Sequence, residues 1–294
     1  MTLALGGAWL AVHGPDRPRD LLIRCLELGF DAVLPGPGPR PRAWAALAEV
    51  WDDLPIRAPA IRVDGLLQPE RGNLASDQAS EVQEVHRRVE GAAALGRKLR
   101  TRVLILEAPR LLLEGFEDEE GELSAARTAW SPDRWRALVA RLDLVRDRAL
   151  ERCCRNLFQI SKSFPDMQLC LTESSSAASL SEPGVVAAIR SDLERQGVGY
   201  WHRPAVVARR GRLGGAGPEE TLELLGDSMV GTDLSDCREA DLLAPPGSGI
   251  VDFGLLAPYM KGLRIDRPGV LEADPSVSIE ELGQARSYLR KYGV

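Results

Sequence analysis

The stretch Gln168-Leu-Cys-Leu-Thr-Glu173 is an apolar run that ends on a single carboxylate. Leucines on both sides of Cys170 are typical of a strand whose two faces are both buried, as in a parallel sheet. Glu173 would then lie where the strand emerges, and this is the edge at which parallel barrels carry their chemistry. Three later runs also end on a charged or polar residue, at 198–203, 228–233 and 269–272. We therefore expect the four strand ends to face one another.

Apolar runs of strand length recur along the whole chain, each followed by a helical pattern. The predicted strands are 3–9, 31–35, 60–64, 102–107, 168–173, 198–203, 228–233 and 269–272. The alternation continues without a linker or a change of composition. It predicts an α/β fold with a single (β/α)8 TIM barrel domain over residues 1–294. An acidic stretch at about 108–130 has the composition of a surface excursion.

Composition excludes several classes of partner. The chain has 294 residues and a net charge of −6, so it lacks the basic face that nucleic acid or an anionic membrane requires. No apolar run is long enough to span a membrane. Five cysteines without metal-ligand spacing, and the lack of a secretory signal pattern, favour a reducing cytoplasm.

Five segments of the second half resemble the xylose isomerase-like TIM barrels, a superfamily of sugar and sugar-phosphate isomerases and epimerases. The segments run from about Asp166 to the C-terminus in the order and spacing of that family: Leu171-Thr-Glu173, Gly199-Tyr-Trp-His-Arg-Pro-Ala-Val206, Val230-Gly-Thr-Asp-Leu-Ser-Asp236, Pro245-Pro-Gly-Ser-Gly-Ile-Val-Asp-Phe253 and Val270-Leu-Glu272. The segment from Pro245 is the most specific match. The resemblance implies a barrel whose ligand binds at the carboxyl ends of the strands.

The resemblance also implies a divalent metal, which this sequence supports only in part. The carboxylates of the family pattern match Glu173 and Glu272, whereas Arg203, Val206 and Asp233 stand where the family has Asp, His and His. A guanidinium group cannot ligate a cation. We therefore expect a degenerate metal site and no cofactor. If Mn²⁺, Mg²⁺ or Zn²⁺ does bind, its ligands would be Glu173, Asp233 and Glu272.

By the same resemblance, Glu173 and Glu272 are the candidate proton-transfer pair, and Arg203 would hold an oxyanion or phosphate in place of the metal. Further candidate ligand-binding residues are His202, Trp201, Asp233, Glu107 and Trp9. The two tryptophans could stack on a sugar face. In the alternative interpretation, Glu173, Glu272 and Arg203 form a structural ion-pair network and His202 is a packed strand residue.

Two functions remain open at this point. The first is a divergent isomerase or epimerase acting on a small polyol, keto sugar or related hydroxy-carbonyl compound. The second is a non-catalytic barrel, a pseudoenzyme that serves as a binding or assembly partner. The partner would be a sugar or anion in the first case, and a second copy or an active paralogue in the second. An AP endonuclease-like activity is disfavoured, because the chain has only three histidines and an acidic balance.

Overall fold

The computed structural model describes residues 2–36, 44, 46–63, 72–111, 132–239, 241–260 and 267–293. Its main feature is one sheet of eight parallel strands, in the order β2-β1-β10-β7-β6-β5-β4-β3. The strands are β1 (Leu3–Gly6), β2 (Ala32–Leu34), β3 (Ile61–Arg62), β4 (Val103–Glu107), β5 (Gln168–Thr172), β6 (Gly199–His202), β7 (Met229–Asp233) and β10 (Gly269–Leu271). The backbone N–H of Arg62 donates to the carbonyl of Pro35 at 2.9 Å, which joins the two end strands. The predicted (β/α)8 barrel is confirmed.

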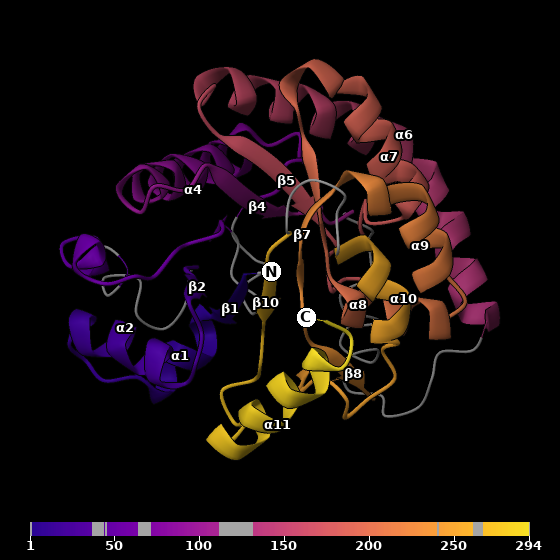
Figure 1. Cartoon of the computed structure of the whole chain (residues 1–294). Helices are drawn as coiled ribbons and strands as arrows, with labels where there is room; N and C mark the ends of the chain where they lie inside the picture. The colour runs from indigo at the N-terminus through magenta and orange to yellow at the C-terminus, as the bar shows by residue number, and fades with distance from the viewer. Residues whose placement is uncertain are drawn as a thin grey trace.

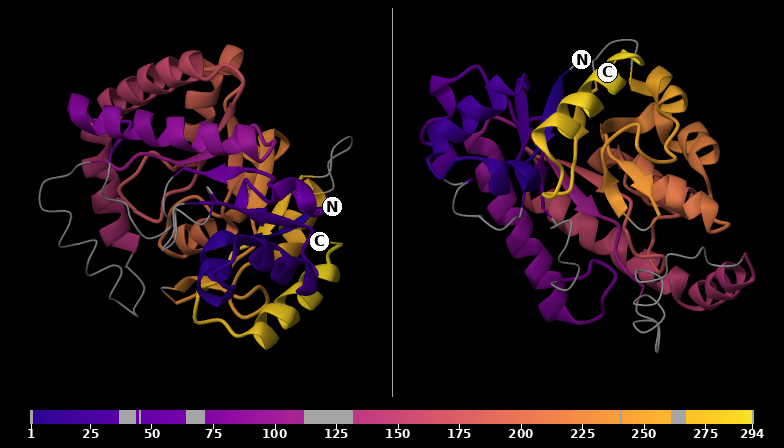
Figure 2. Two further views of the ribbon diagram at one scale, coloured as in Figure 1. Left: turned by 90° about the vertical axis from the view of Figure 1, so that its left-hand side faces the viewer. Right: turned by 90° about the horizontal axis from the view of Figure 1, so that it is seen from below.

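Helices surround the sheet, and both ends of the chain lie on the same side of the barrel (Figures 1 and 2). The helices are α1 (Gly7–His13), α2 (Pro18–Glu27), α4 (Ala79–Lys98), α6 (Pro132–Ser163), α7 (Pro183–Asp192), α8 (Pro204–Arg212), α9 (Pro218–Leu225), α10 (Phe253–Met260) and α11 (Ile279–Arg290). Short 3₁₀ turns cover Trp51–Asp53, Glu194–Gln196 and Gly226–Ser228. Among the described residues, no helix combines the length and the apolar composition that crossing a membrane requires.

Each predicted strand is present, but the first one ends earlier than expected. The predicted strand 3–9 stops at Gly6, and Trp9 lies in α1. A Cβ on Gly6 would lie 2.1 Å from Oε2 of Glu272, so the backbone approaches that carboxyl group closely. The indole of Trp9 then turns away and donates to the carbonyl of Val277 at 2.8 Å.

Three other features differ from the sequence prediction. Helix α8 and the antiparallel hairpin of β8 (Asp236–Arg238) and β9 (Asp241–Ala244) were not predicted. The expected excursion at about 108–130 falls mostly on residues 112–131, outside the described residues. Its first residues are not on the surface: Ala108 and Leu111 are buried, and their backbone N–H groups donate to the carbonyls of Thr172 and Ala178.

The barrel interior is filled by small and aliphatic side chains around one large ring. It contains Ala4, Ala32, Leu34, Ala60, Ile105, Cys170, Trp201 and Val270, contributed by successive strands or the residues just before them. Trp201 is completely buried. Its ring lies against Gly231 on the neighbouring strand, where an added Cβ would come within 2.4 Å of a ring carbon. The indole of Trp201 therefore requires glycine at position 231.

We expect Gly231→Ala to lower the free energy of unfolding by about 1–3 kcal/mol, because the methyl group overpacks the barrel interior against Trp201. Gly91→Ala is the matched control: Gly91 lies exposed within α4, and an added Cβ there meets nothing within 4 Å. The control should raise the free energy of unfolding by about 0.5–1 kcal/mol. Urea denaturation of both variants measures the difference, and equal effects would contradict this packing.

Candidate functional site

The alternation of side chains along the strands decides which residues enter the mouth of the barrel. Interior positions such as Ile105, Trp201 and Val270 point inward. Residues two positions further along the same strands point inward again, at the carboxyl ends. We call this set the mouth layer: Arg62, Glu107, Thr172, Arg203, Asp233 and Glu272.

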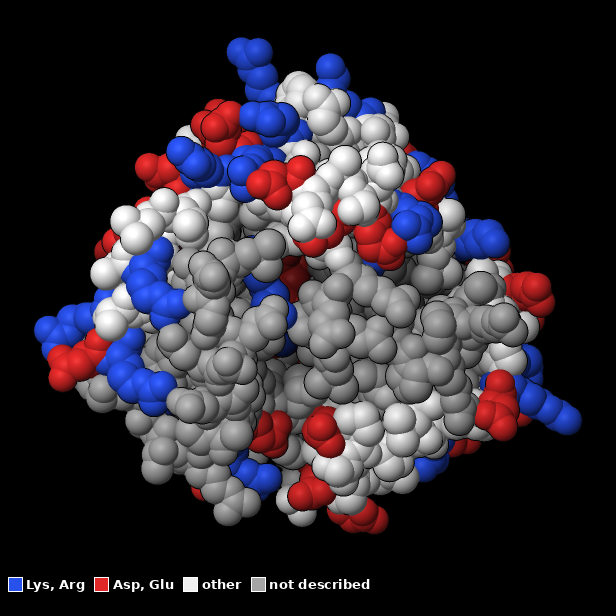
Figure 3. Space-filling view, turned by 180° about the vertical axis from the view of Figure 1, so that it is seen from behind, with Lys and Arg blue, Asp and Glu red and all other residues white. Residues whose placement is uncertain are grey.

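Figure 3 shows the face of the molecule seen from behind the view of Figure 1. This face is hollowed near its centre, and both acidic and basic side chains lie at the bottom of the hollow. All of the mouth layer except Glu107 is buried. These charged groups are thus kept from bulk water. Their interactions with one another are stronger in this buried layer than they would be at the surface.

Two arginines hold the carboxylates of the mouth layer. One nitrogen of Arg62, Nη2, lies 2.7 and 2.8 Å from the two oxygens of Asp233 and 3.5 Å from Oε1 of Glu272. The side chain of Arg203 lies 3.5 Å from Asp233 and 3.9 Å from Glu107. Trp201 completes the cluster from below, because its indole N–H donates to Asp233 at 2.8 Å. Asp233 is therefore the centre of this network.

Burial and the charges of the mouth layer together shift the pKa values of two of its members. Burial raises the pKa of Glu272 to about 7; the negative charge of Asp233 adds to the rise, whereas Arg62 and Arg203 oppose it. Burial alone would lower the pKa of the Arg62 guanidinium, but Asp233, Glu272 and Glu107 together raise it. Arg62 thus stays cationic, and Glu272 exchanges its proton near neutral pH.

Glu173 does not join the mouth layer, contrary to the expectation that all four strand ends face one another. Because Thr172 takes the inward position, the next side chain points to the outer face of the sheet, as Tyr200 and His202 do. The Tyr200 hydroxyl donates to Oε1 of Glu173 and also lies 2.6 Å from Nδ1 of His202. The backbone N–H of Arg203 donates to Oε2 of Glu173 at 2.8 Å. We call Glu173, Tyr200 and His202 the outer cluster.

The outer cluster keeps Glu173 ionised. Burial would raise its pKa, but the hydrogen bond and charge of His202, the charge of Arg210 and the Tyr200 hydroxyl lower it below the usual value. Arg210 itself is buried and donates to the carbonyls of Ser181 and Ala216. Glu173 is therefore a stably charged group on the helix side of the barrel.

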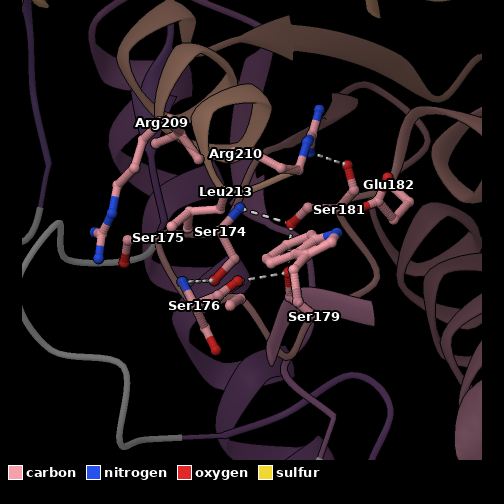
Figure 4. A pocket seen from close by; sticks show the side chains of 12 residues that line it. Ser174, Ser175, Ser176, Ser179, Ser181, Glu182, Arg209, Arg210 and Leu213 are labelled. Carbon is pink, nitrogen blue, oxygen red and sulfur yellow. Dashed lines mark hydrogen bonds between the residues drawn. The ribbon is translucent and has the colours of Figure 1, made fainter. Parts of the chain in front are cut away.

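A small pocket lies beside the outer cluster, between α8 and the loop that follows Glu173 (Figure 4). Serine hydroxyls, Arg209 and Arg210 line it together with Trp135. Its volume of about 30 Å³ has room for one or two water molecules. Hydrogen bonds among Ser174, Ser179 and Ser181 fix the shape of the loop.

The remaining candidates have well-defined places. Trp201 fills the barrel interior, and Trp9 is buried in α1 with its ring stacked on His13, so neither offers an open ring face at the mouth. Glu107 is fixed by the backbone N–H of Ser175 at 3.0 Å.

Arg62, Thr172 and Tyr200 were not identified as site residues from the sequence. The run Ala60-Ile-Arg-Val63 carries the signal for Arg62, because a charged residue inside a buried strand needs a partner.

Known structures share this architecture over nearly their whole length. A 3-keto-D-glucoside 4-epimerase from E. coli superposes with a TM-score of 0.68 at 10% identity, covering 99% of both chains. A D-psicose 3-epimerase from Clostridium cellulolyticum gives 0.68 at 10%, again covering 99% of both. A xylose isomerase domain-containing protein from Salmonella typhimurium gives 0.63 at 12%, covering 98% of this chain and 96% of that one. The chain has the xylose isomerase-like barrel fold. No protein-family model and no curated protein matches the sequence.

The carboxylate oxygens of Asp233 and Glu173, which would ligate a divalent metal in this xylose isomerase-like barrel, are already occupied by hydrogen bonds. Arg62 already donates to both oxygens of Asp233, and both oxygens of Glu173 accept hydrogen bonds in the outer cluster. Within the described part of the chain, no three His, Cys, Asp or Glu side chains are grouped so that they could hold a metal ion. That this barrel binds no divalent metal remains a prediction.

We expect Tyr200→Phe to lower the free energy of unfolding by about 1.5–3 kcal/mol at pH 7, because it removes a hydrogen bond to a buried carboxylate. The pKa of Glu173 is lowered in the folded chain. The stability that its ionised carboxylate contributes is therefore present above the unfolded-state pKa and is lost as the pH falls through the folded-state pKa. The deficit should therefore shrink in acid. Tyr292→Phe, which loses only a 3.2 Å contact with the Tyr288 hydroxyl, is the control for urea denaturation.

Glu272 gives the opposite pH dependence. Its folded pKa of about 7 lies above the ordinary 4.5, so its contribution to stability is complete below pH 4.5 and is lost as pH rises through 7. We expect Glu272→Gln to gain stability relative to the native chain between pH 5 and pH 8, on the order of 2–3 kcal/mol. Denaturation midpoints across this range measure the gain. The exposed control Glu220→Gln should give a curve of stability against pH that runs parallel to the native one. A parallel curve for Glu272→Gln as well would rule out a buried, ionisable Glu272.

Proposed function

We propose that this chain binds a small polyol or keto sugar at the mouth of the barrel and moves a proton next to the carbonyl of that ligand, as an isomerase or epimerase does. One observation carries the proposal. Glu272 and Glu107 follow or end strands β10 and β4, which are four places apart in the eight-stranded order, so they lie on opposite sides of the mouth. Two arginines of the same layer bind these carboxylates.

This arrangement suits a reaction through an enediolate. A carboxylate takes the proton from the carbon next to the carbonyl, and the C–H electron pair becomes the new C=C bond. The carbonyl π pair moves onto oxygen, which becomes negative and needs a cationic or hydrogen-bonding partner. Return of the proton to the other face of the same carbon gives the epimer. Its return to the former carbonyl carbon, with transfer of the neighbouring hydroxyl proton to the former carbonyl oxygen, gives the isomer. The sequence consumes no further reagent.

Glu272 is the principal candidate for proton transfer. A group whose pKa is near the working pH both accepts and donates a proton efficiently, and its pKa of about 7 meets this condition. Glu107 is the complementary carboxylate, about one-fifth exposed and so accessible from the open end. Arg203 is suited to hold an oxygen atom of the ligand. Glu173 would act only from outside the mouth, by fixing the backbone of Arg203.

The structural neighbours support this substrate class only by analogy. Two of those named above are epimerases of sugars or sugar derivatives. At 10% identity the likeness supports only the fold, so the proposed activity has to be argued from the residues of the site. The second candidate function, a non-catalytic partner barrel, is favoured by a different observation: each charged group of the mouth layer already has an oppositely charged neighbour within 4 Å.

A deuterium-exchange screen separates the two functions. Ketopentoses, ketohexoses and their phosphates are incubated with the purified chain in D₂O, and proton NMR follows exchange next to the carbonyl. We expect exchange with at least one sugar and a loss of roughly 10²- to 10⁴-fold in Glu272→Gln. Glu220→Gln, on the exposed side of α9, should keep the native rate. Unchanged turnover in Glu272→Gln would refute the assignment, and no exchange with any sugar would favour the non-catalytic barrel.

A further inference from the structure

Three buried polar atoms of the mouth layer have no hydrogen-bond partner among the described residues. They are Nε of Arg62, Oγ1 of Thr172 and Oε2 of Glu272. The residues belong to or follow three different strands, β3, β5 and β10, and each side chain is at least nine-tenths buried. An unmade hydrogen bond at such an atom costs free energy, so buried polar groups in proteins normally have a partner. Three of them in one layer indicate the place of a ligand.

The chemistry of these atoms defines what would satisfy them. The N–H of Arg62 can only donate, whereas the Thr172 hydroxyl donates and accepts, and Glu272 does either according to its protonation. A ligand with a carbonyl or enolate oxygen beside hydroxyl groups supplies all of these complements. A simple cation does not, because it would face the N–H donor of Arg62.

Of the residues that the structure describes, Arg62 is also the cation nearest the carboxylates of Asp233 and Glu272. Its Nη2 binds Asp233 and lies 3.5 Å from Glu272, so the guanidinium stands between these two acids. The Asp233 carboxylate fixes this nitrogen by both oxygens. The Nε–H therefore has a fixed direction, and it has no hydrogen-bond partner among the described residues.

We propose that Arg62 is a further catalytic residue: its Nε–H binds the carbonyl oxygen of the ligand and stabilises the enediolate, the task of a divalent cation in a metal-dependent barrel. Thr172 binds a neighbouring hydroxyl group. This inference rests on the proposed function for the reaction, but the binding it requires can be measured without turnover. The mouth layer then works without a divalent metal.

The test uses glycolohydroxamate, a planar mimic of an enediolate, titrated calorimetrically into the native chain in the presence of EDTA. We expect one molecule to bind per chain. Arg62→Met should weaken binding roughly 10- to 100-fold, and Thr172→Val roughly 2- to 10-fold, as expected for loss of a charged and a neutral hydrogen bond. Arg57→Met, which breaks an exposed ion pair with Asp31, should bind as the native chain does.

Thr172→Val keeps the test valid if Arg62→Met fails to fold. The Thr172 hydroxyl has no partner in the described protein, so its replacement by a methyl group should leave the thermal midpoint unchanged or raised while weakening the hydroxamate. Equal affinity of the native chain and Thr172→Val, or no binding to the native chain, would overturn the proposal. The proposal would also be overturned if one Mn²⁺ bound per chain in EDTA-free buffer and the hydroxamate bound only in its presence.

The two proposals fail in different ways. Hydroxamate binding that depends on Arg62, in a chain that exchanges no sugar proton, supports the site and rejects the proposed function. Sugar turnover that requires Mn²⁺ supports the function and rejects the role of Arg62.

Discussion

The two-residue period of a β-strand is the constraint on which the site depends. In a closed barrel, one face of every strand points into the interior and the other packs under the helices. Small side chains such as Ala4 and Ala60 leave room for Trp201, and the same alternation carries Arg62, Asp233 and Glu272 into the mouth. It also turns Glu173 outward. A shift by one residue would exchange the two sets.

The mouth layer illustrates how buried charge is tolerated. Taking carboxylates and guanidinium groups out of water is costly, and their attraction compensates only when the geometry is good. Here Asp233 accepts from Arg62 and Trp201 together, whereas Glu272 receives one longer contact and keeps an oxygen unpaired. The carboxyl group with the fewest partners is the one whose pKa is raised to about 7. The raised pKa of Glu272 thus follows from burial that its few partners do not offset.

The sequence predicts the architecture better than the site. Strand positions follow from apolar runs and helical spacing, and these are local signals. The orientation of Glu173 is not local: its run reads Leu-Cys-Leu-Thr-Glu, and only the pairing of Thr172 with Trp201 shows which side chain faces inward. Arg62 could have been found by counting in twos from Ala60. Helix α8 was not predicted because it begins directly after the strand, and its N-cap residue Arg203 makes no side-chain cap hydrogen bond.

The mouth layer and the outer cluster meet at one residue, and this links the two faces of strand β6. Arg203 donates its backbone N–H to the Glu173 carboxylate and its guanidinium N–H to the Glu173 carbonyl, while the same guanidinium lies near Asp233 and Glu107. A backbone held by a buried, ionised acid cannot easily move. The charge of Glu173 therefore fixes the position from which Arg203 reaches the mouth, although its own carboxylate points away. In this barrel, a strand-end glutamate organises the site from behind.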